Sequence, residues 1–430
     1  MADEERARAR APLWRLSPAQ RLLEGGALLN SLAFFAAMPF APLYLSEHTA
    51  LGKPAVGAVV GAVALTAAFG GLLGGMIVDR LGAVPLMRVG LLLYVAVYAL
   101  LATARAATAI IVLFLLLGVA RLMVEPGAKK LLSQVADGEG RVFRVRYMTL
   151  CAGAIGGPAI GGALYQVGAV AFFAVPAGFY AAYLVLVVLR HADLAALEPI
   201  RSRRSRRSRR SLGPPPTVRG RASSRSPVAA TLRDRRLLAV VTAGIVVFFV
   251  FSQMESMIPL YMKSRYGDRT EEYFAALFIT NAVLALALQL PIDRVSGRLG
   301  RNVMVVAGAL NFTVAFACFW ASPSSLAWLY VGIVFWTIGE GILLPMPDMA
   351  VHEMADDEHK GAYFGLSEVR QLGFFLGPFA GGFLLDAGTV PYFAVMGTFI
   401  FLCVPLLLRR TAAQPSAPAH DENARVPDPT

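Results

Sequence analysis

Charged residues are scarce in this sequence. Asp, Glu, Lys and Arg make up only 16% of its 430 residues, whereas 57% are hydrophobic and the mean hydropathy is +0.59. A soluble domain is closer to half apolar and a quarter charged. Because an aqueous fold cannot hide so many apolar segments, the composition excludes a soluble globular protein.

Cysteine is almost absent, and the common motifs of catalysis and metal binding are missing. Cys151, Cys318 and Cys403 all fall in apolar stretches, so we expect neither a disulfide nor a zinc site. There is no P-loop, no H-E-x-x-H and no nucleophile motif. We therefore expect a protein that is not an enzyme and holds no metal and no cofactor. A membrane enzyme or receptor is the remote alternative.

Long apolar stretches account for most of the chain. An α-helix needs about 20 apolar residues to cross a bilayer. The charged first 21 residues contain no apolar core with a small-residue cleavage site, so we expect no cleaved signal peptide. The pattern predicts an all-α membrane protein with 12 transmembrane helices, at residues 25–46, 55–78, 86–104, 108–134, 143–167, 169–190, 237–262, 272–292, 302–321, 325–350, 361–385 and 389–408.

The net charge of +12 comes from one segment. Residues 201–236 contain thirteen Arg and one Asp, while the rest of the chain has 27 basic and 27 acidic residues. A nucleic-acid partner is therefore not expected. The Ser, Gly and Pro content of the segment predicts a linker without fixed structure. Two interpretations stay open: a solvated cytoplasmic loop, or a segment attracted to anionic lipid headgroups.

Basic residues between the apolar stretches also indicate the orientation. Loops on one side carry Arg80, Arg88, Lys129 and Arg294, whereas the opposite loops are poor in Lys and Arg except at residues 263–269. The basic side is cytoplasmic by the positive-inside rule. We expect a multi-pass protein of the plasma or inner membrane with both termini in the cytoplasm.

Several short patterns recur about 220 residues apart. PLY at 42–44 returns at 259–261, DRLG at 79–82 returns as GRLG at 297–300, and GAIGGPAIGG at 153–162 returns as GFFLGPFAGG at 373–382. Two copies of a six-helix unit explain this order. We predict two pseudo-symmetric six-helix bundles at 22–190 and 237–410, an Arg-rich cytoplasmic linker at 191–236, and cytoplasmic tails at 1–21 and 411–430, the second disordered.

The sequence GMIVDRLGAV resembles a loop motif of the major facilitator superfamily, G-x-x-x-D-R-x-G-R-R/K. Gly75, Asp79, Arg80 and Gly82 match, whereas Ala-Val replaces the basic pair. The resemblance covers all twelve stretches. It implies the major facilitator fold, in which this loop latches the cytoplasmic ends of two halves that rock about a central site.

The repeated glycine-proline pattern is similar to the antiporter signature of the drug-exporting branch of that family. Glycines four and eight residues apart lie on one helix face and let another backbone approach, and proline bends the helix. We interpret the pattern as tight packing at a moving interface, with a direct role in exchange as the alternative. Its residues are Gly153, Gly157, Pro158, Gly161 and Gly162 in the first copy, and Gly373, Gly377, Pro378, Gly381 and Gly382 in the second.

Charges inside the apolar stretches are the candidates for proton coupling, because such charges usually serve ion or proton movement. The candidates are Arg121, Glu125, Glu255 and Glu340. Arg121 and Glu340 occupy equivalent places in the two copies, so we hypothesise that they pair across the cavity. Glu125, one helical turn from Arg121, is the competing partner. Candidates for the cavity wall are Asn30, Phe34, Met38, Gln253, Met254 and Trp336.

These features predict a secondary active transporter that works by alternating access. We expect proton-coupled efflux of lipophilic small molecules, with the substrate, the proton and the bilayer as partners and a monomer as the working unit. The alternative is a proton-coupled importer of a small metabolite or peptide on the same fold. Such an importer would be expected to carry more polar groups around its cavity.

Deletion of residues 201–210 is expected to leave insertion and transport largely intact, because a linker of this composition buries no apolar surface. Transport by the deletion variant in vesicles, normalised to the amount of inserted protein, tests this. A collapse of transport would show that the arginines are needed for the transport cycle.

Overall fold

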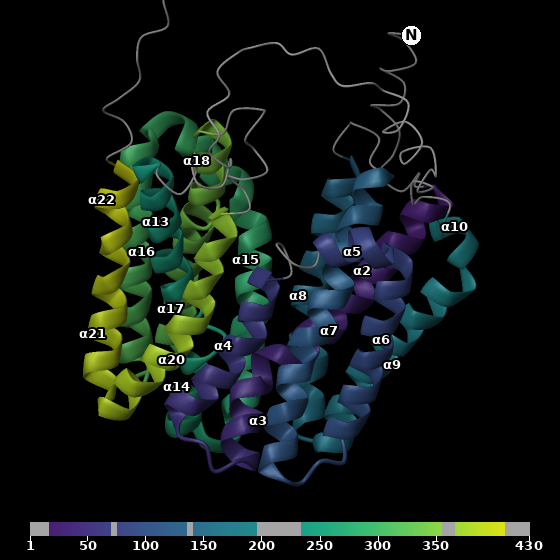
Figure 1. The fold of residues 1–430 in the computed structure, drawn as a ribbon. Helices are drawn as coiled ribbons and strands as arrows, with labels where there is room; N and C mark the ends of the chain where they lie inside the picture. Colours follow the sequence, from purple (N-terminus) through teal and green to yellow (C-terminus); the bar gives the residue numbers. More distant parts are fainter. Residues whose placement is uncertain (1–16, 70–74, 136–140, 196–233, 355–365, 409–430) are drawn as a thin grey trace, which may run out of the picture.

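Every regular element of this computed structural model is a helix, within the residues that it describes: 17–69, 75–135, 141–195, 234–354 and 366–408. The helices form two bundles that stand side by side (Figure 1). The N-terminal bundle contains α2 (Pro18–Ala37), η1 (Met38–Phe40), α3 (Ala41–His48), α4 (Lys53–Phe69), α5 (Gly75–Leu81), α6 (Ala83–Leu101), α7 (Ala107–Gln134), α8 (Arg141–Tyr165), α9 (Ala169–Leu189) and α10 (His191–Ala195).

The C-terminal bundle repeats this order of long and short helices. It contains α13 (Arg235–Phe251), α14 (Met257–Tyr266), η3 (Gly267–Arg269), α15 (Thr270–Leu299), α16 (Arg301–Ala321), α17 (Ala327–Leu343), α18 (Met346–Met354), η4 (Glu368–Gln371), α20 (Leu372–Ala387), α21 (Thr389–Phe399), η5 (Ile400–Leu402) and α22 (Cys403–Leu408).

The two bundles share two opposite ends. Helices α10, α13 and α22 mark one end, here called the terminal face, and α3 and α14 mark the other, the distal face (Figure 1). Helices α4 and α20 pack together across the bundle boundary, and so do α8 and α15. Most of the linker and tails predicted from the sequence lies outside the described residues, and the predicted domain boundaries stay a prediction.

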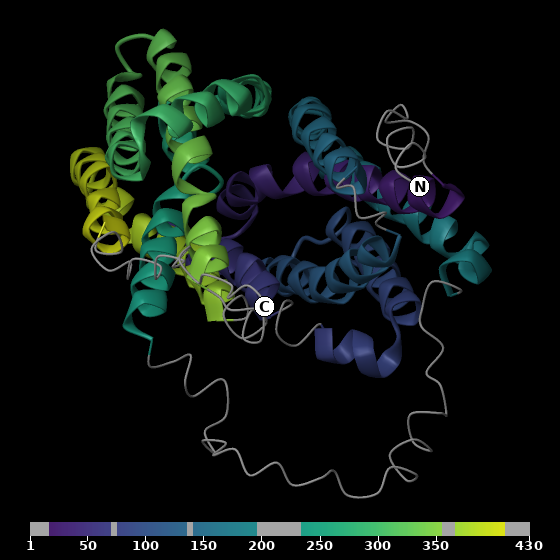
Figure 2. The same cartoon turned by 90° about the horizontal axis from the view of Figure 1, so that it is seen from above.

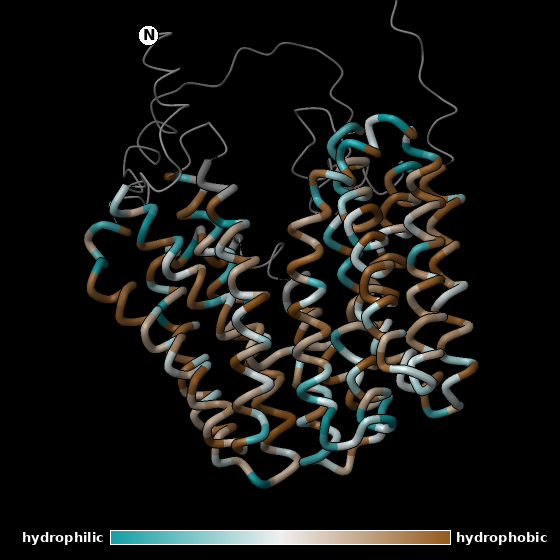
Figure 3. Tube along the Cα trace, turned by 180° about the vertical axis from the view of Figure 1, so that it is seen from behind, coloured by the Kyte–Doolittle hydropathy of each residue, from teal (hydrophilic) through white to brown (hydrophobic). Residues whose placement is uncertain are grey.

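Among the described residues, nine helical segments are long and apolar enough to cross a membrane. Three of the twelve predicted stretches, 55–78, 237–262 and 361–385, are not covered by these nine segments. Residues 237–262 are divided where α13 ends at Phe251 and α14 begins at Met257, while 55–78 and 361–385 run partly outside the described residues. The fold is an all-α membrane fold, with hydrophilic residues gathered toward the helix ends (Figure 3). The count of twelve stays a prediction.

Glycine backbone geometry repeats between the bundles. Gly82 and Gly300 precede α6 and α16 with φ of 92° and 72°, and Gly168 and Gly388 precede α9 and α21 with φ of 122° and 138°. Side chains disfavour this left-handed region, so glycine is the default there. The shared conformation at matching helix starts supports the two-copy interpretation.

The glycines of the first pattern bring α8 against α2. A Cβ atom on Gly157 would lie 2.5 Å from Phe35 Cβ, and Gly153 and Gly161 face Ser31 and Ala36 in the same way. Such distances are shorter than real Cβ contacts, so the two backbones approach as only glycine permits. Pro158 lies inside α8 between these glycines.

The second pattern packs α20 against α13 in the same manner. Gly373 and Gly377 face the backbone of Phe249, and Gly381 faces Gln253. The last glycine of each pattern contacts the other bundle instead, since a Cβ on Gly162 would lie 2.7 Å from Ala275 Cβ and a Cβ on Gly382 2.5 Å from Pro54 Cα. The pattern thus brings helices close both within the bundles and between them.

Replacing Gly157 with Ala is expected to destabilise the N-terminal bundle by about 1–3 kcal/mol, because the added methyl group overlaps Phe35 and the crowded helices must separate. Thermal unfolding of the protein in detergent measures the loss. Gly178→Ala on α9 is the matched control, because nothing lies within 4 Å of its added Cβ. Equal melting temperatures for the two variants would contradict the steric interpretation.

Candidate functional site: a central cavity and a distal latch

A cavity of about 200 Å³ lies at the boundary between the bundles, which Figure 2 shows side by side. Its wall is mostly apolar and aromatic, with four polar side chains. The N-terminal bundle contributes Phe34, Phe35, Met38, Val60, Val63, Ala64 and Arg121, and the C-terminal bundle contributes Ser252, Glu255, Gln371, Phe374 and Pro378.

Arg121 on α7 is already paired within its own bundle. Its Nε donates to Glu125 Oε1 at 2.9 Å, which follows from the spacing of four residues on one helix face. Its guanidinium also lies 4.9 Å from the centre of the Phe34 ring, a cation–π distance. The ion pair of Arg121 is therefore formed with Glu125 of its own bundle.

Glu255 lies at the break between α13 and α14. At this break the backbone turns, and the N–H groups of Ser256, Met257 and Ile258 all reach the carbonyl of Gln253. An interrupted helix lets the side chain of Glu255 project into the cavity. Within the described part of the chain, its carboxylate has no hydrogen bond and no ion pair, and it lies within electrostatic range of Arg121.

Glu340 on α17 is held by its own bundle. Its Oε2 accepts a hydrogen bond of 3.0 Å from Asn281 Nδ2 on α15, and the same amide group donates to Thr337 at 2.9 Å. Glu340 also lies within electrostatic range of Glu255 and of Tyr147 on α8 of the other bundle. The pair of Arg121 with Glu340 is not formed in this conformation, and its formation in another one stays a prediction.

Four of the six residues predicted for the cavity wall do not line the cavity in this conformation. Trp336 is fully buried among Phe251, Phe312, Phe316 and Phe319, because the indole ring completes the aromatic core of the C-terminal bundle.

Gln253 and Met254 are also buried outside the cavity. Gln253 donates to the Phe249 carbonyl at 3.0 Å and accepts from Tyr392 at 3.2 Å, so it joins helices within the bundle. Met254 belongs to the hydrophobic core. Asn30 is half-buried and is not part of the wall, whereas Phe34 and Met38 are.

The loop motif lies at the terminal face. Gly75, Asp79 and Arg80 fall in the short helix α5, and Gly82 ends the turn before α6. The side chain of Asp79 is outside what the structure describes. The role of this loop as a latch stays a prediction.

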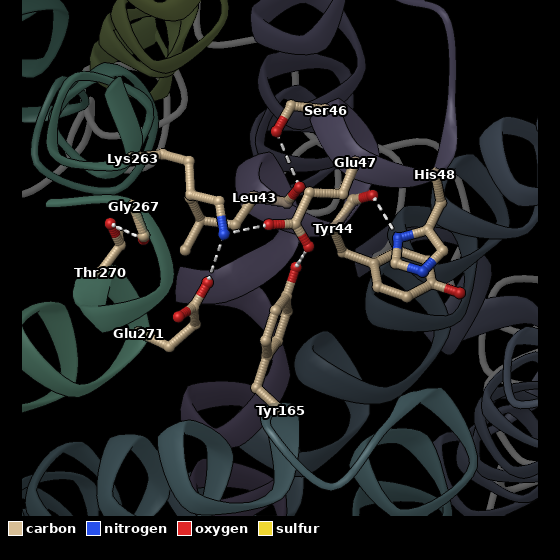
Figure 4. Close-up of polar contacts among 10 residues, drawn as sticks. All are labelled: Leu43, Tyr44, Ser46, Glu47, His48, Tyr165, Lys263, Gly267, Thr270 and Glu271. Atoms are coloured by element: carbon tan, nitrogen blue, oxygen red, sulfur yellow. Dashed lines mark hydrogen bonds and ion pairs between the residues drawn. The ribbon is translucent and has the colours of Figure 1, made fainter. Parts of the chain in front are cut away.

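A polar cluster on the distal face, which the sequence reasoning missed, joins the bundles (Figure 4). Lys263 Nζ on α14 lies 2.6 Å from Glu47 Oε1 on α3 and 3.1 Å from Glu271 Oε1 on α15. Tyr165 on α8 donates to the other oxygen of Glu47 at 2.7 Å. We call Glu47, Tyr165, Lys263 and Glu271 the distal latch. Its only sequence signal was the unusual group of basic residues at 263–269.

A second ion pair closes the same face. Lys53 Nζ at the start of α4 lies 2.9 Å from Asp386 Oδ1 near the end of α20. Both of these ion-paired sites, Glu47–Lys263 and Lys53–Asp386, join the two bundles at the distal face. Arg370, Asp348 and Glu368, by contrast, form an ion-pair cluster inside the C-terminal bundle. The conformation is therefore one in which the bundles are joined by charge at the distal face.

Comparison with known proteins gives matches over almost the whole chain. The family model described as Major Facilitator Superfamily matches residues 24–369 and 270–428. The uncharacterized MFS-type transporter YqjV of Bacillus subtilis is 29% identical over 394 residues, 89% of this chain and 91% of that protein. The multidrug resistance protein MdtH of Cronobacter sakazakii is 27% identical over 365 residues, 84% of this chain and 85% of that protein.

Solved structures match at lower identity. A peptide transporter POT in complex with sulfate has a TM-score of 0.74 at 15% identity, covering 93% of this chain and 95% of that one. The human organic anion transporter MFSD10 (TETRAN) has a TM-score of 0.59 at 18% identity, covering 91% of this chain and all of that one. At these identities the likeness shows the fold alone.

Replacing Lys263 with Ala is expected to favour opening of the distal face, because Glu47 and Glu271 would then face each other without a cation between them. A shift of roughly 1 kcal/mol, about fivefold in the ratio of closed to open molecules, is expected for a partly exposed pair. Electron-spin distance measurements between labels at the exposed positions Ala50 and Val390, in a variant without native cysteines, follow the opening.

Two further variants make this prediction specific. Glu47→Ala should have a smaller effect, because Lys263 keeps Glu271 as its partner. Arg190→Ala is the control, since it removes an exposed ion pair with Asp193 inside one bundle. An unchanged distance distribution in Lys263→Ala would show that the latch does not hold the bundles together.

Proposed function

Since the chain belongs to the Major Facilitator Superfamily, we propose that it is a secondary active transporter that exports lipophilic small molecules in exchange for protons. The observation that carries the proposal is the central cavity, in which an aromatic wall surrounds one unpaired carboxylate. The name of the relative MdtH, a multidrug resistance protein, is consistent with export.

The wall of the cavity suits substrates of varied shape. Phe34, Phe35 and Phe374 offer flat apolar surfaces, and Met38 adapts its side chain to different partners. The polar groups are few, and the charge of Arg121 is already balanced by Glu125. A sugar or peptide would need more hydrogen-bond partners than this wall offers, so the importer on the same fold is less well supported.

Glu255 is the group that we assign to proton coupling. A carboxylate that is buried in a mostly apolar site and makes no ion pair or hydrogen bond is less stable as an anion than in water, and it is neutralised by a proton or by a cationic ligand. Glu125 is held by Arg121, and Glu340 by Asn281, so both have partners in this conformation. Because Glu255 has none among the described residues, it is free to exchange a proton with the cavity.

Alternating access follows from rocking of the two bundles about the cavity. The distal latch and the Lys53–Asp386 pair stabilise the conformation closed at the distal face. Their separation opens that face, while the glycine-lined contacts of α4 with α20 and of α8 with α15 let the helices move close to each other.

We place the terminal face in the cytoplasm and the protein in the plasma or inner membrane. The orientation rests on the basic positions of the sequence, of which Arg80 lies in α5 toward that face, and basic loops are retained in the cytoplasm. The working unit is a monomer, and the proton and a lipophilic small molecule are its ligands.

Transport into inverted membrane vesicles tests the direction and the coupling. Lipophilic dyes should accumulate in the vesicles when the interior is made acidic, and accumulation should stop when the pH gradient is dissipated. Accumulation without a gradient would contradict proton coupling. Uptake by right-side-out vesicles alone would favour the importer.

Replacing Glu255 with Gln is expected to lower gradient-driven transport by roughly tenfold, equal to about 1.4 kcal/mol, while exchange without a gradient continues. The amide keeps the size of the side chain but cannot release a proton. Glu272→Gln, an exposed carboxylate of the distal face, is the control. If Glu255→Gln transports normally and Glu340→Gln or Glu125→Gln does not, the coupling role belongs to that residue instead.

A further inference from the structure

A second pocket lies within the N-terminal bundle at its distal face. Its volume is about 600 Å³, three times that of the central cavity. The wall is formed by the end of α3, the turn between α6 and α7, and the turn between α8 and α9. Because long apolar helices end here, the pocket lies where the hydrocarbon region of a bilayer meets water.

The chemistry of the wall is divided into an apolar part and a cationic part. Seven Ala and Val side chains and Ile110 make the apolar part, and Val167 and Val170 at its edge are 72% and 65% exposed. The polar part consists of His48, Thr103 and Arg105 with the phenol of Tyr44. None of the described residues that line the pocket has a carboxylate.

Arg105 is a free cation on this wall. It is exposed and has no ion pair with any residue of the described chain. The lysines of the distal face, in contrast, are engaged: Lys53 pairs with Asp386, and Lys263 with Glu47 and Glu271. A guanidinium that is left without a carboxylate beside an apolar pocket is complementary to a phosphate group.

His48 is held in position on the wall of the same pocket. Its ring stacks on Tyr44, with the centroids 4.1 Å apart and the planes 14° from parallel (Figure 4). Its Nδ1 lies 3.1 Å from the carbonyl oxygen of Tyr44, which leaves the other ring nitrogen available to a ligand. Of Arg105 and His48, the guanidinium of Arg105 offers the hydrogen-bond donors for a phosphodiester, and the stacked imidazole ring is a rigid part of the wall.

We propose that this pocket binds an anionic phospholipid, with the phosphate at Arg105 and an acyl chain along Val167 and Val170. A zwitterionic lipid fits less well, because its ammonium group would find no carboxylate in the wall. The site is separate from the ends of α10 and α13 that flank the Arg-rich linker, because these ends lie at the terminal face (Figure 1).

Native mass spectrometry of the full-length protein, titrated with phosphatidylglycerol or phosphatidylethanolamine, tests the proposal. Phosphatidylglycerol should bind more tightly. Arg105→Ala should weaken it about fivefold, close to the 1 kcal/mol that one basic residue contributes near an anionic surface. Arg269→Ala is the matched control, because Arg269 is also an exposed distal arginine but lies in the other bundle.

A second variant distinguishes lipid binding in the pocket from non-specific electrostatic attraction to the protein surface. Ala171→Phe fills the apolar part without changing charge and should also weaken phosphatidylglycerol binding; its melting temperature shows whether it is folded. Equal affinity for the two lipids, or equal loss in Arg105→Ala and Arg269→Ala, would overturn the proposal. Displacement by inorganic phosphate at the concentration at which lipid binds would assign the pocket to free phosphate and overturn the lipid assignment.

Discussion

The close approach of backbones across the bundle boundary is the constraint on which this fold depends. A Cβ on Gly61 of α4 would lie 2.8 Å from Phe375 Cα on α20, and Gly57 one turn earlier faces the carbonyl of Pro378. Inside a bilayer there is no hydrophobic force between helices, so shape and close contact must hold them together. Small residues at this boundary therefore decide how near the bundles can come, and the distal ion pairs can form only once they have done so.

The distribution of charged residues also follows from the apolar interior of the bilayer. Buried charges need partners, and those of the cavity region are paired inside one bundle, as Arg121 is with Glu125, or hydrogen-bonded there, as Glu340 is with Asn281. The ion pairs Glu47–Lys263 and Lys53–Asp386 join the bundles at the distal face, where water is near and separating the two charges costs less free energy. This arrangement lets the bundles separate without leaving an uncompensated charge in the apolar interior. Glu255 is the exception, and for that reason we assign the proton to it.

The apolar stretches of the sequence predicted the helices, but not which side of each helix faces the cavity. Trp336, Gln253 and Met254 stand on stretches that do border the central region, yet all three face the core of the C-terminal bundle. In a membrane protein both the core and the lipid-facing surface are apolar, so a Trp or Met carries no signal of its direction. The helix break at Ser252–Ser256 places Glu255 in the cavity wall. It contains no proline or glycine from which the break could have been predicted.

The sequence by itself determined the all-helical membrane fold and its two-copy organisation, because apolar length and the repeated glycine-proline pattern are local features that survive without tertiary contacts. It also indicated Arg121, Glu125, Glu255 and Glu340, because a charged residue in an apolar stretch can be recognised without knowing which way its side chain faces. Only the tertiary structure decided which of these charges are paired. Only it could join Glu47 to Lys263 and gather the pocket around Arg105, because those residues are far apart in the chain or lie in turns whose positions are fixed by the packing of whole helices.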